Sequence, residues 1–190
     1  MDSLKLYMVL LGCRPPGRFT EQHDIFFGIG TSLKNIIPDI IKSWPEAKGK
    51  IHLDAFREVT CVDGYRIEVI EKILPVINQE EEKLFFINLG GYKENEFEEF
   101  HYKMLAVAKS QSEAIRSSKQ TAFFKHTGFK GAPSHIDDKY GIDVDDIFTV
   151  QDILAKDLKE KYHIQITKRE CQEDTLHLGY FPLKKIAEEY

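Results

Sequence analysis

KLYMVLLGCRPPGRFTEQH, residues 5–23, and KLFFINLGGYKENEFEEFH, residues 83–101, are two versions of one segment. The offset between them is 78 at every position, and seven of the nineteen aligned pairs are identical. Unrelated segments would match at about one position in nineteen, so we predict a duplicated supersecondary unit. The identical pairs are Lys5/Lys83, Leu6/Leu84, Leu11/Leu89, Gly12/Gly90, Phe19/Phe97, Glu21/Glu99 and His23/His101.

The pattern around each copy predicts a strand followed by a helix. Residues 4–11 and 83–89 are apolar runs that end at glycine, which is typical of strands buried on both faces. Residues 19–44 and 97–117 carry apolar side chains at helical spacing, and Pro38 is expected to kink the first of these helices. Residues 51–56 and 65–70 alternate and predict two strands, with a turn at Asp63-Gly64 between them.

The rest of the chain resembles a second, diverged version of this pattern. Residues 134–137 and 140–144 repeat the chemistry of residues 51–54 and 65–69, residues 121–125 predict an extra strand, and residues 145–162 predict a helix. Strands are predicted at residues 163–168 and 175–181. We therefore expect an α/β fold of the α+β kind, in which two tandem strand–helix–strand–strand repeats form one mixed sheet with helices packed on it.

Composition favours one compact domain over residues 1–190, with a first repeat at 1–78. The second repeat, at 79–190, would carry a C-terminal helix and strand extension. Hydrophobic residues make up 42% of the chain, which is enough for a buried core, and the net charge of −5 disfavours a general nucleic-acid binder. No apolar run approaches the length of a membrane span, and the opening residues show no secretion signal. The three widely spaced cysteines predict no disulfide framework and suit a reducing cytoplasm.

Three stretches resemble a known family: LYMVLLGCRPPGRFTEQHD at residues 6–24, FFGIGTSLKNIIPDI at 26–40 and GKIHLDAFREVTCVDGYRIEV at 49–69. Together they are similar to bacterial proteins that carry one or two copies of the domain of unknown function 1543. The resemblance implies a soluble bacterial protein with a duplicated domain. It implies no activity and supplies no catalytic residues, so the chemistry is argued from this chain.

A doubled polar set is the first candidate site. The first copy has Glu21-x-His23 and His52-x-Asp54, and the matching set in the second copy is Glu99, His101, His135 and Asp137. Two histidines and two carboxylates suit zinc, iron or manganese, and equally suit an acid/base pair. The alternative is structural, in which each histidine bonds a nearby carboxylate and fastens a helix to the sheet. No cofactor is assigned at this stage, and a divalent metal is the candidate that these residue types suit.

The loop at residues 13–18 is the second candidate. Arg14 and Arg18, together with backbone N–H groups, would hold a phosphate or carboxylate, and the acidic second copy lacks these arginines. Cys13 does not fit a cysteine phosphatase loop, because only four residues separate it from Arg18. Gly28 and Gly30 lack the third glycine of a dinucleotide fingerprint, and we expect them to allow close packing of helix on sheet.

These observations predict a cytoplasmic binding or regulatory module for a small anionic ligand or a protein partner. Arg14, Arg18, Glu21 and His23 would line its site. The alternative is a metal-assisted hydrolase that uses Glu21, His23, His52 and Asp54, and nucleic-acid binding comes third. An exposed sheet edge would allow two chains to pair as a homodimer.

Overall fold

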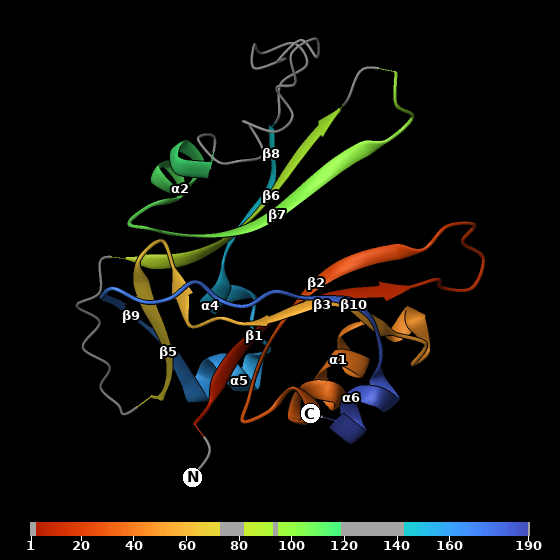
Figure 1. Ribbon diagram of the computed structural model, residues 1–190, viewed down its shortest axis with the longest axis horizontal. Helices are drawn as coiled ribbons and strands as arrows, with labels where there is room; N and C mark the ends of the chain where they lie inside the picture. The colour runs from red at the N-terminus through yellow and green to blue at the C-terminus, as the bar shows by residue number, and fades with distance from the viewer. Residues whose placement is uncertain (1–2, 73–81, 93–94, 119–142, 190) are drawn as a thin grey trace. The chain divides into compact units, whose positions relative to one another are not determined.

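The computed structural model describes residues 3–72, 82–92, 95–118 and 143–189, and the chain divides into two compact units (Figure 1). Unit 1 comprises Met1–Ile77 and Leu154–Tyr190, and unit 2 comprises Asn78–Ile153. The described strands form three sheets, and every strand pairing in them is antiparallel. The predicted mixture of helices and strands is therefore present, but the expectation of one mixed sheet is wrong.

Unit 1 contains a four-stranded sheet of order β10-β3-β1-β2 and a three-stranded sheet of order β4-β5-β9. The strands of the first sheet are β1 (Lys5–Cys13), β2 (Gln22–Gly30), β3 (His52–Glu58) and β10 (His177–Pro182). Those of the second are β4 (Cys61–Val62), β5 (Tyr65–Glu71) and β9 (Tyr162–Lys168). The helical segments are η1 (Leu33–Ile36), α1 (Ile37–Ser43), η2 (Pro45–Ala47), α5 (Lys156–Lys161) and α6 (Leu183–Glu189).

β1 and β2 form a hairpin, so the helix predicted at residues 19–44 is wrong over its first part. β2 pairs with β1 from Lys5↔Gly30 to Cys13↔Gln22, and the helical segments begin only at Leu33. All five residues at 26–30 are buried, so apolar side chains lie on both faces of the strand. That burial removes the alternation by which a strand is recognised and leaves a spacing that imitates a helix.

In unit 2 the secondary structure predicted for the second copy is wrong in the same way. Its sheet has the order β7-β6-β8, with β6 (Lys83–Tyr92), β7 (Glu99–Ala108) and β8 (Asp143–Thr149). The helix predicted at 97–117 is strand β7 followed by the short helix α2 (Gln111–Ser118). The helix predicted at 145–162 begins as strand β8 and continues as α4 (Val150–Ile153) and α5. Among the described residues, β1, β2, α1 and β3 follow the order strand–strand–helix–strand, as do β6, β7, α2 and β8, instead of the predicted strand–helix–strand–strand.

The other described strands lie where the sequence predicted them. Residues 4–11, 51–56, 65–70, 83–89, 163–168 and 175–181 correspond to β1, β3, β5, β6, β9 and β10. Asp63 and Gly64 form a two-residue turn with φ of 53° and 77°, but this turn joins β5 to the short β4, not directly to β3. The predictions for residues 121–125 and 134–137 lie outside the described residues.

One face of the larger sheet of unit 1 carries the core. Tyr7, Val9 and Leu11 point from β1 into a cluster with residues of the helical segments, namely Leu33, Ile36, Ile40 and Ile186. Gly30 allows this approach, since a Cβ there would lie 3.0 Å from Ile36 Cγ2. The predicted close packing at the glycines is therefore confirmed, although they belong to a strand. The opposite face of β1 carries Gly12, where the candidate site lies.

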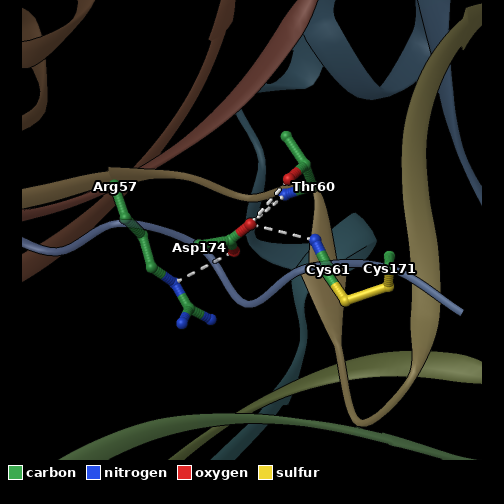
Figure 2. The surroundings of a disulfide bond; sticks show 5 residues. All are labelled: Arg57, Thr60, Cys61, Cys171 and Asp174. Atoms are coloured by element: carbon green, nitrogen blue, oxygen red, sulfur yellow. Dashed lines mark hydrogen bonds and ion pairs between the residues drawn. A yellow bond between two sulfur atoms is a disulfide. The ribbon is translucent and has the colours of Figure 1, made fainter.

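A disulfide joins Cys61 of β4 to Cys171, across 110 residues of sequence and with a Cα–Cα distance of 5.9 Å (Figure 2). This corrects the expectation of three unpaired cysteines, because spacing along a chain does not report distance in the fold. Disulfides persist mainly in oxidising compartments, so this pairing gives no support to the predicted cytoplasmic location. Among the described residues, no helix is long and apolar enough to cross a membrane.

Asp174 holds the segment between Cys171 and β10 against residues 60 and 61 by hydrogen bonds. Its Oδ1 accepts hydrogen bonds from Thr60 N at 2.9 Å, Thr60 Oγ1 at 2.7 Å and Cys61 N at 3.0 Å, and its Oδ2 lies 3.8 Å from Arg57 Nε (Figure 2). Only 1% of its side chain is exposed, so these partners offset the cost of burying the carboxylate. Burial lowers the pKa of Arg57, although the Asp174 carboxylate opposes that effect. The segment leading to β10 is thus held both covalently and electrostatically.

We predict that replacing both Cys61 and Cys171 with serine lowers the free energy of unfolding by about 2–4 kcal/mol, because the long covalent loop no longer restricts the unfolded chain. Urea unfolding with and without reductant measures the effect. The serine variant is its own control, since reductant should shift the midpoint of wild type only. A wild-type midpoint that reductant leaves unchanged would contradict the pairing.

Candidate functional site

The hairpin register places two histidines on either side of Gly12. Gly12 lies opposite His23 of β2 and opposite His52 of β3, so both imidazoles flank the same backbone position near the end of β1. Glu21 precedes β2 at the end of the hairpin loop. Two strands, β2 and β3, and the hairpin loop therefore supply neighbouring side chains above Gly12 of β1.

A β-bulge adds Asp54 to this group. Leu10 pairs with Ala55 and Leu11 pairs with Leu53, so Asp54 is the extra residue on β3. Such a bulge redirects a side chain locally, and here it places the carboxylate on the face of His52. His52 Nε2 and Asp54 Oδ1 lie 3.2 Å apart, so the two side chains lie on one face of β3.

The four side chains form a ring in which histidines and carboxylates alternate. His52 Nε2 lies 3.2 Å from Glu21 Oε1 as well as from Asp54 Oδ1. His23 Nε2 lies 3.3 Å from Asp54 Oδ2 and 3.8 Å from Glu21 Oε2. Zinc binds such nitrogen and oxygen atoms at roughly 2.0–2.2 Å, and a tetrahedron with bonds of that length has edges of about 3.4 Å. Each histidine–carboxylate separation in the ring is close to that edge length, although each carboxylate meets the two histidines through different oxygen atoms. We call these four residues, Glu21, His23, His52 and Asp54, the first cluster.

Burial differs across the first cluster. The His52 side chain is 10% exposed, and its ring centroid lies 4.4 Å from that of Tyr180 on β10. Asp54 Oδ2 is buried and receives no hydrogen bond from any described residue. Glu21 and His23 are 45% and 43% exposed. The cluster therefore has a fixed inner side and an outer side that solvent reaches.

Gly12 makes room for the first cluster. A Cβ at this position would lie 2.4 Å from both Asp54 Oδ2 and His52 Nε2, closer than van der Waals contact permits. The identity of Gly12 and Gly90 in the two copies thus has a physical cause that the sequence alone did not reveal. The Asp54 and His52 side chains occupy the space that a side chain at position 12 would need.

The two arginines do not join the first cluster. Arg14 and Arg18 are exposed on the hairpin loop, and no described contact links either side chain to the four residues. Arg18 instead lines a surface cavity of about 600 Å³ together with Trp44 and Lys48. His23 borders this cavity, whose other lining residues are Pro15, Pro16, Gln22, Asp24 and Glu46. The predicted anion site at Arg14 and Arg18 stays a prediction.

The second copy contains a smaller group that the sequence reasoning identified only in part. Glu99 and His101 lie on β7, where a helix was predicted, and Asp145 of β8 joins them. The sequence predicts a helix over residues 145–162, so Asp145 is not expected beside Glu99 and His101. His135 and Asp137, the predicted partners, lie outside the described residues. The signal that would have identified Asp145 is the resemblance of DVDDIF at 143–148 to HLDAF at 52–56.

Cys13 is not placed for nucleophilic chemistry. The residue is 1% exposed and belongs to the core cluster on the face of the sheet opposite the first cluster. Burial raises the pKa of its thiol, and the nearby Glu21 carboxylate raises that pKa further. Reactive cysteines have lowered pKa values and are accessible, so this one acts as a packing residue.

Comparison with known proteins agrees with the resemblance seen in the sequence. Residues 18–69 match the family model of the Domain of Unknown Function DUF1543, and all four residues of the first cluster lie within that match. A solved structure, described as that of protein Il1583 from Idiomarina loihiensis, is similar over 95% of this chain and 98% of its own. Its TM-score is 0.62 and its sequence identity 26%. None of the curated proteins matches the chain.

We predict that Gly12→Ala lowers the free energy of unfolding by about 1–3 kcal/mol, because the new methyl group overlaps the His52 and Asp54 side chains. The control is the same substitution in a His52→Ala/Asp54→Ala background, where the overlap is gone and the cost should nearly vanish. Urea unfolding of the four proteins gives the coupling energy. Equal costs in both backgrounds would show that the first cluster does not occupy the space above Gly12.

Proposed function

We propose that this protein binds a divalent transition metal through the first cluster, and that the outer side of the metal takes a small anionic ligand. The observation that carries the proposal is the closed ring of four contacts between 3.2 and 3.8 Å, in which each of the two imidazole Nε2 atoms lies beside both carboxylates. Imidazole and carboxylate together suit zinc, iron and manganese.

The contacts within the ring favour a cation shared by the four side chains over a structural role in which each histidine bonds a carboxylate directly. Each of the four contacts joins a histidine Nε2 to a carboxylate oxygen and is an ion pair only when the imidazole is protonated, and none of them is among the described hydrogen bonds. A neutral imidazole whose Nε2 lone pair faces a carboxylate oxygen is repelled unless a proton or a metal ion lies between them. The buried Asp54 Oδ2 lacks a hydrogen-bond donor, and a metal ion would satisfy it.

Charge and exposure support the second part of the proposal. Two carboxylates and two neutral histidines balance a doubly charged metal, so the bound centre carries no net charge that would repel an anion. Glu21 and His23 are nearly half exposed, which leaves one side open to solvent and ligand. Metals that prefer six ligands would keep positions free on that side, beyond the four protein groups.

The predicted duplication is part of this proposal. Gly12 is opposite His23 in the first hairpin, and Gly90 is opposite His101 in the second, so the offset of 78 seen in the sequence is kept in the strand register. We propose that both hairpins descend from one unit that served as a ligand-bearing scaffold.

Metal binding is tested with His23→Ala, matched by Asp24→Asn as control. Asp24 is the next residue on β2. It lies opposite Leu11 in the strand pairing, so its side chain points to the face of the sheet opposite that of His23. Substituting a group that merely supports a ligand often lowers metal affinity 10- to 100-fold, so removal of a ligand should lower it by at least about 100-fold. Zinc and manganese affinities are measured by calorimetric titration, and Asp24→Asn should equal wild type.

Thermal unfolding completes this test. Metal at about 100 times its Kd should stabilise wild type by about 2.7 kcal/mol, and His23→Ala should lose that gain while its metal-free Tm stays near the wild-type value. A fall in the metal-free Tm with unchanged metal affinity would establish the structural role instead. Wild type that binds none of zinc, manganese or ferrous iron would refute the proposal.

Metal-assisted hydrolysis is the second candidate, and the exposure of Glu21 is the observation that favours it. A carboxylate on the open side of a metal is placed to accept a proton from a coordinated water. We expect metal-dependent hydrolysis of p-nitrophenyl phosphate, if present, to disappear in His23→Ala and to fall about 10²–10⁴-fold in Glu21→Gln. Hydrolysis that persists in His23→Ala would arise elsewhere, and its absence in metal-loaded wild type would leave the binding role alone.

A further inference from the structure

Unit 2 holds a group of three metal-ligating side chains in the part of the chain that the sequence marked as the second copy. Glu99 and His101 lie on β7, and Asp145 lies on β8. One ligand atom from each lies within 4.8 Å of the others, and His101 Nε2 is 3.3 Å from Asp145 Oδ2. We call Glu99, His101 and Asp145 the second cluster.

The backbone of the second cluster reproduces that of the first. Gly90 lies opposite His101 on one side and opposite Asp143 on the other, as Gly12 lies between His23 and His52. The pairing of β6 with β8 shifts between Asn88 and Leu89, which leaves Asp145 as the extra residue. Asp145 therefore stands in the register position of the bulge residue Asp54, and Asp143 stands in that of His52.

The free space above the glycine is used in the same way. A Cβ at Gly90 would meet the Asp145 carboxylate at 2.2 Å. At Gly12 the Asp54 carboxylate occupies the corresponding space. Two sheets thus each bring a bulge carboxylate over a glycine and beside a histidine of the hairpin. A chance meeting of exposed charges does not require a matching register, a matching bulge and a matching glycine.

From this arrangement we propose that the second cluster is a separate divalent-cation site with a lower preference for zinc than the first cluster. Its ligands are two carboxylates and one imidazole, and an acidic residue stands in the register position that a second histidine has in unit 1. Oxygen-rich sets favour harder cations such as Mn²⁺, whereas additional imidazole favours zinc.

Exposure sets the expected strength of this site. The side chains of His101 and Asp145 are 36% and 31% exposed, whereas His52 in the first cluster is 10% exposed. Water completes the coordination shell of a metal held by three accessible protein groups. The second cluster should therefore bind more weakly than the first and exchange its metal faster, and the two sites should be separable by titration.

The test counts Mn²⁺ bound by the full-length chain, using the electron paramagnetic resonance signal of free Mn²⁺. A His23→Ala background removes the first cluster. We expect that protein to bind one Mn²⁺, and to bind at least tenfold more weakly after His101→Ala or Asp145→Asn. Its Zn²⁺/Mn²⁺ affinity ratio should be at least about tenfold smaller than that of the first cluster, measured in a His101→Ala background.

Asp146→Asn is the matched control, because this neighbouring carboxylate accepts a hydrogen bond from Asn88 Nδ2 at 3.2 Å and is outside the second cluster. Mn²⁺ binding that Asp146→Asn weakens as much as Asp145→Asn would reveal a diffuse acidic patch and overturn the proposal. Absence of Mn²⁺ binding in the His23→Ala protein would overturn it too. The outcome is independent of the proposed function, since loss of metal in His101→Ala alone would uphold the second cluster even if His23→Ala had no effect.

Discussion

The register of the β1–β2 and β1–β3 pairings is the constraint on which the site depends. It sets Gly12 between His23 and His52, and one bulge then adds the Asp54 carboxylate. A slip of one residue in either pairing would turn a histidine to the core face, because successive side chains of a strand point to opposite faces. The apolar residues of β1 resist that slip, since Tyr7, Val9 and Leu11 are buried against the helical segments on the other face. The same pairing thus specifies both the core and the candidate ligands.

The rest of unit 1 supports β3 from its other side. β10 pairs with β3 antiparallel, and Tyr180 places its ring against His52. The segment before β10 is tied down by the Cys61–Cys171 disulfide and by the hydrogen bonds of Asp174. A chain segment more than a hundred residues away in sequence therefore helps to hold the inner side of the first cluster. Groups that orient a ligand in this way commonly affect metal affinity as much as the immediate environment of the metal does.

The two clusters show how one scaffold carries different chemistry. Both use a glycine, a hairpin histidine and a bulge carboxylate, which are backbone-determined features. They differ at the strand position occupied by His52 in the first cluster and by Asp143 in the second. In a duplicated unit, packing and register constrain most positions, so a ligand position is one of the few that can vary without unfolding the sheet. If both clusters bind metal as proposed, this difference in one register position would give the two sites separate metal preferences.

The sequence by itself determined the duplication signal and six of the strands, because local hydrophobic patterns and spacing report local structure, and it singled out the four residues of the first cluster as candidates. It did not determine β2, where burial on both faces over residues 26–30 makes a strand resemble a helix, and it did not determine β7, whose apolar residues also fall at helical spacing. It also missed the disulfide and did not include Asp145 in the second set. Those features depend on which strands pair and on where a bulge falls, and such long-range contacts exist only once the chain has folded. Tertiary structure decided which polar residues meet, while the sequence had already supplied residues with the right chemistry.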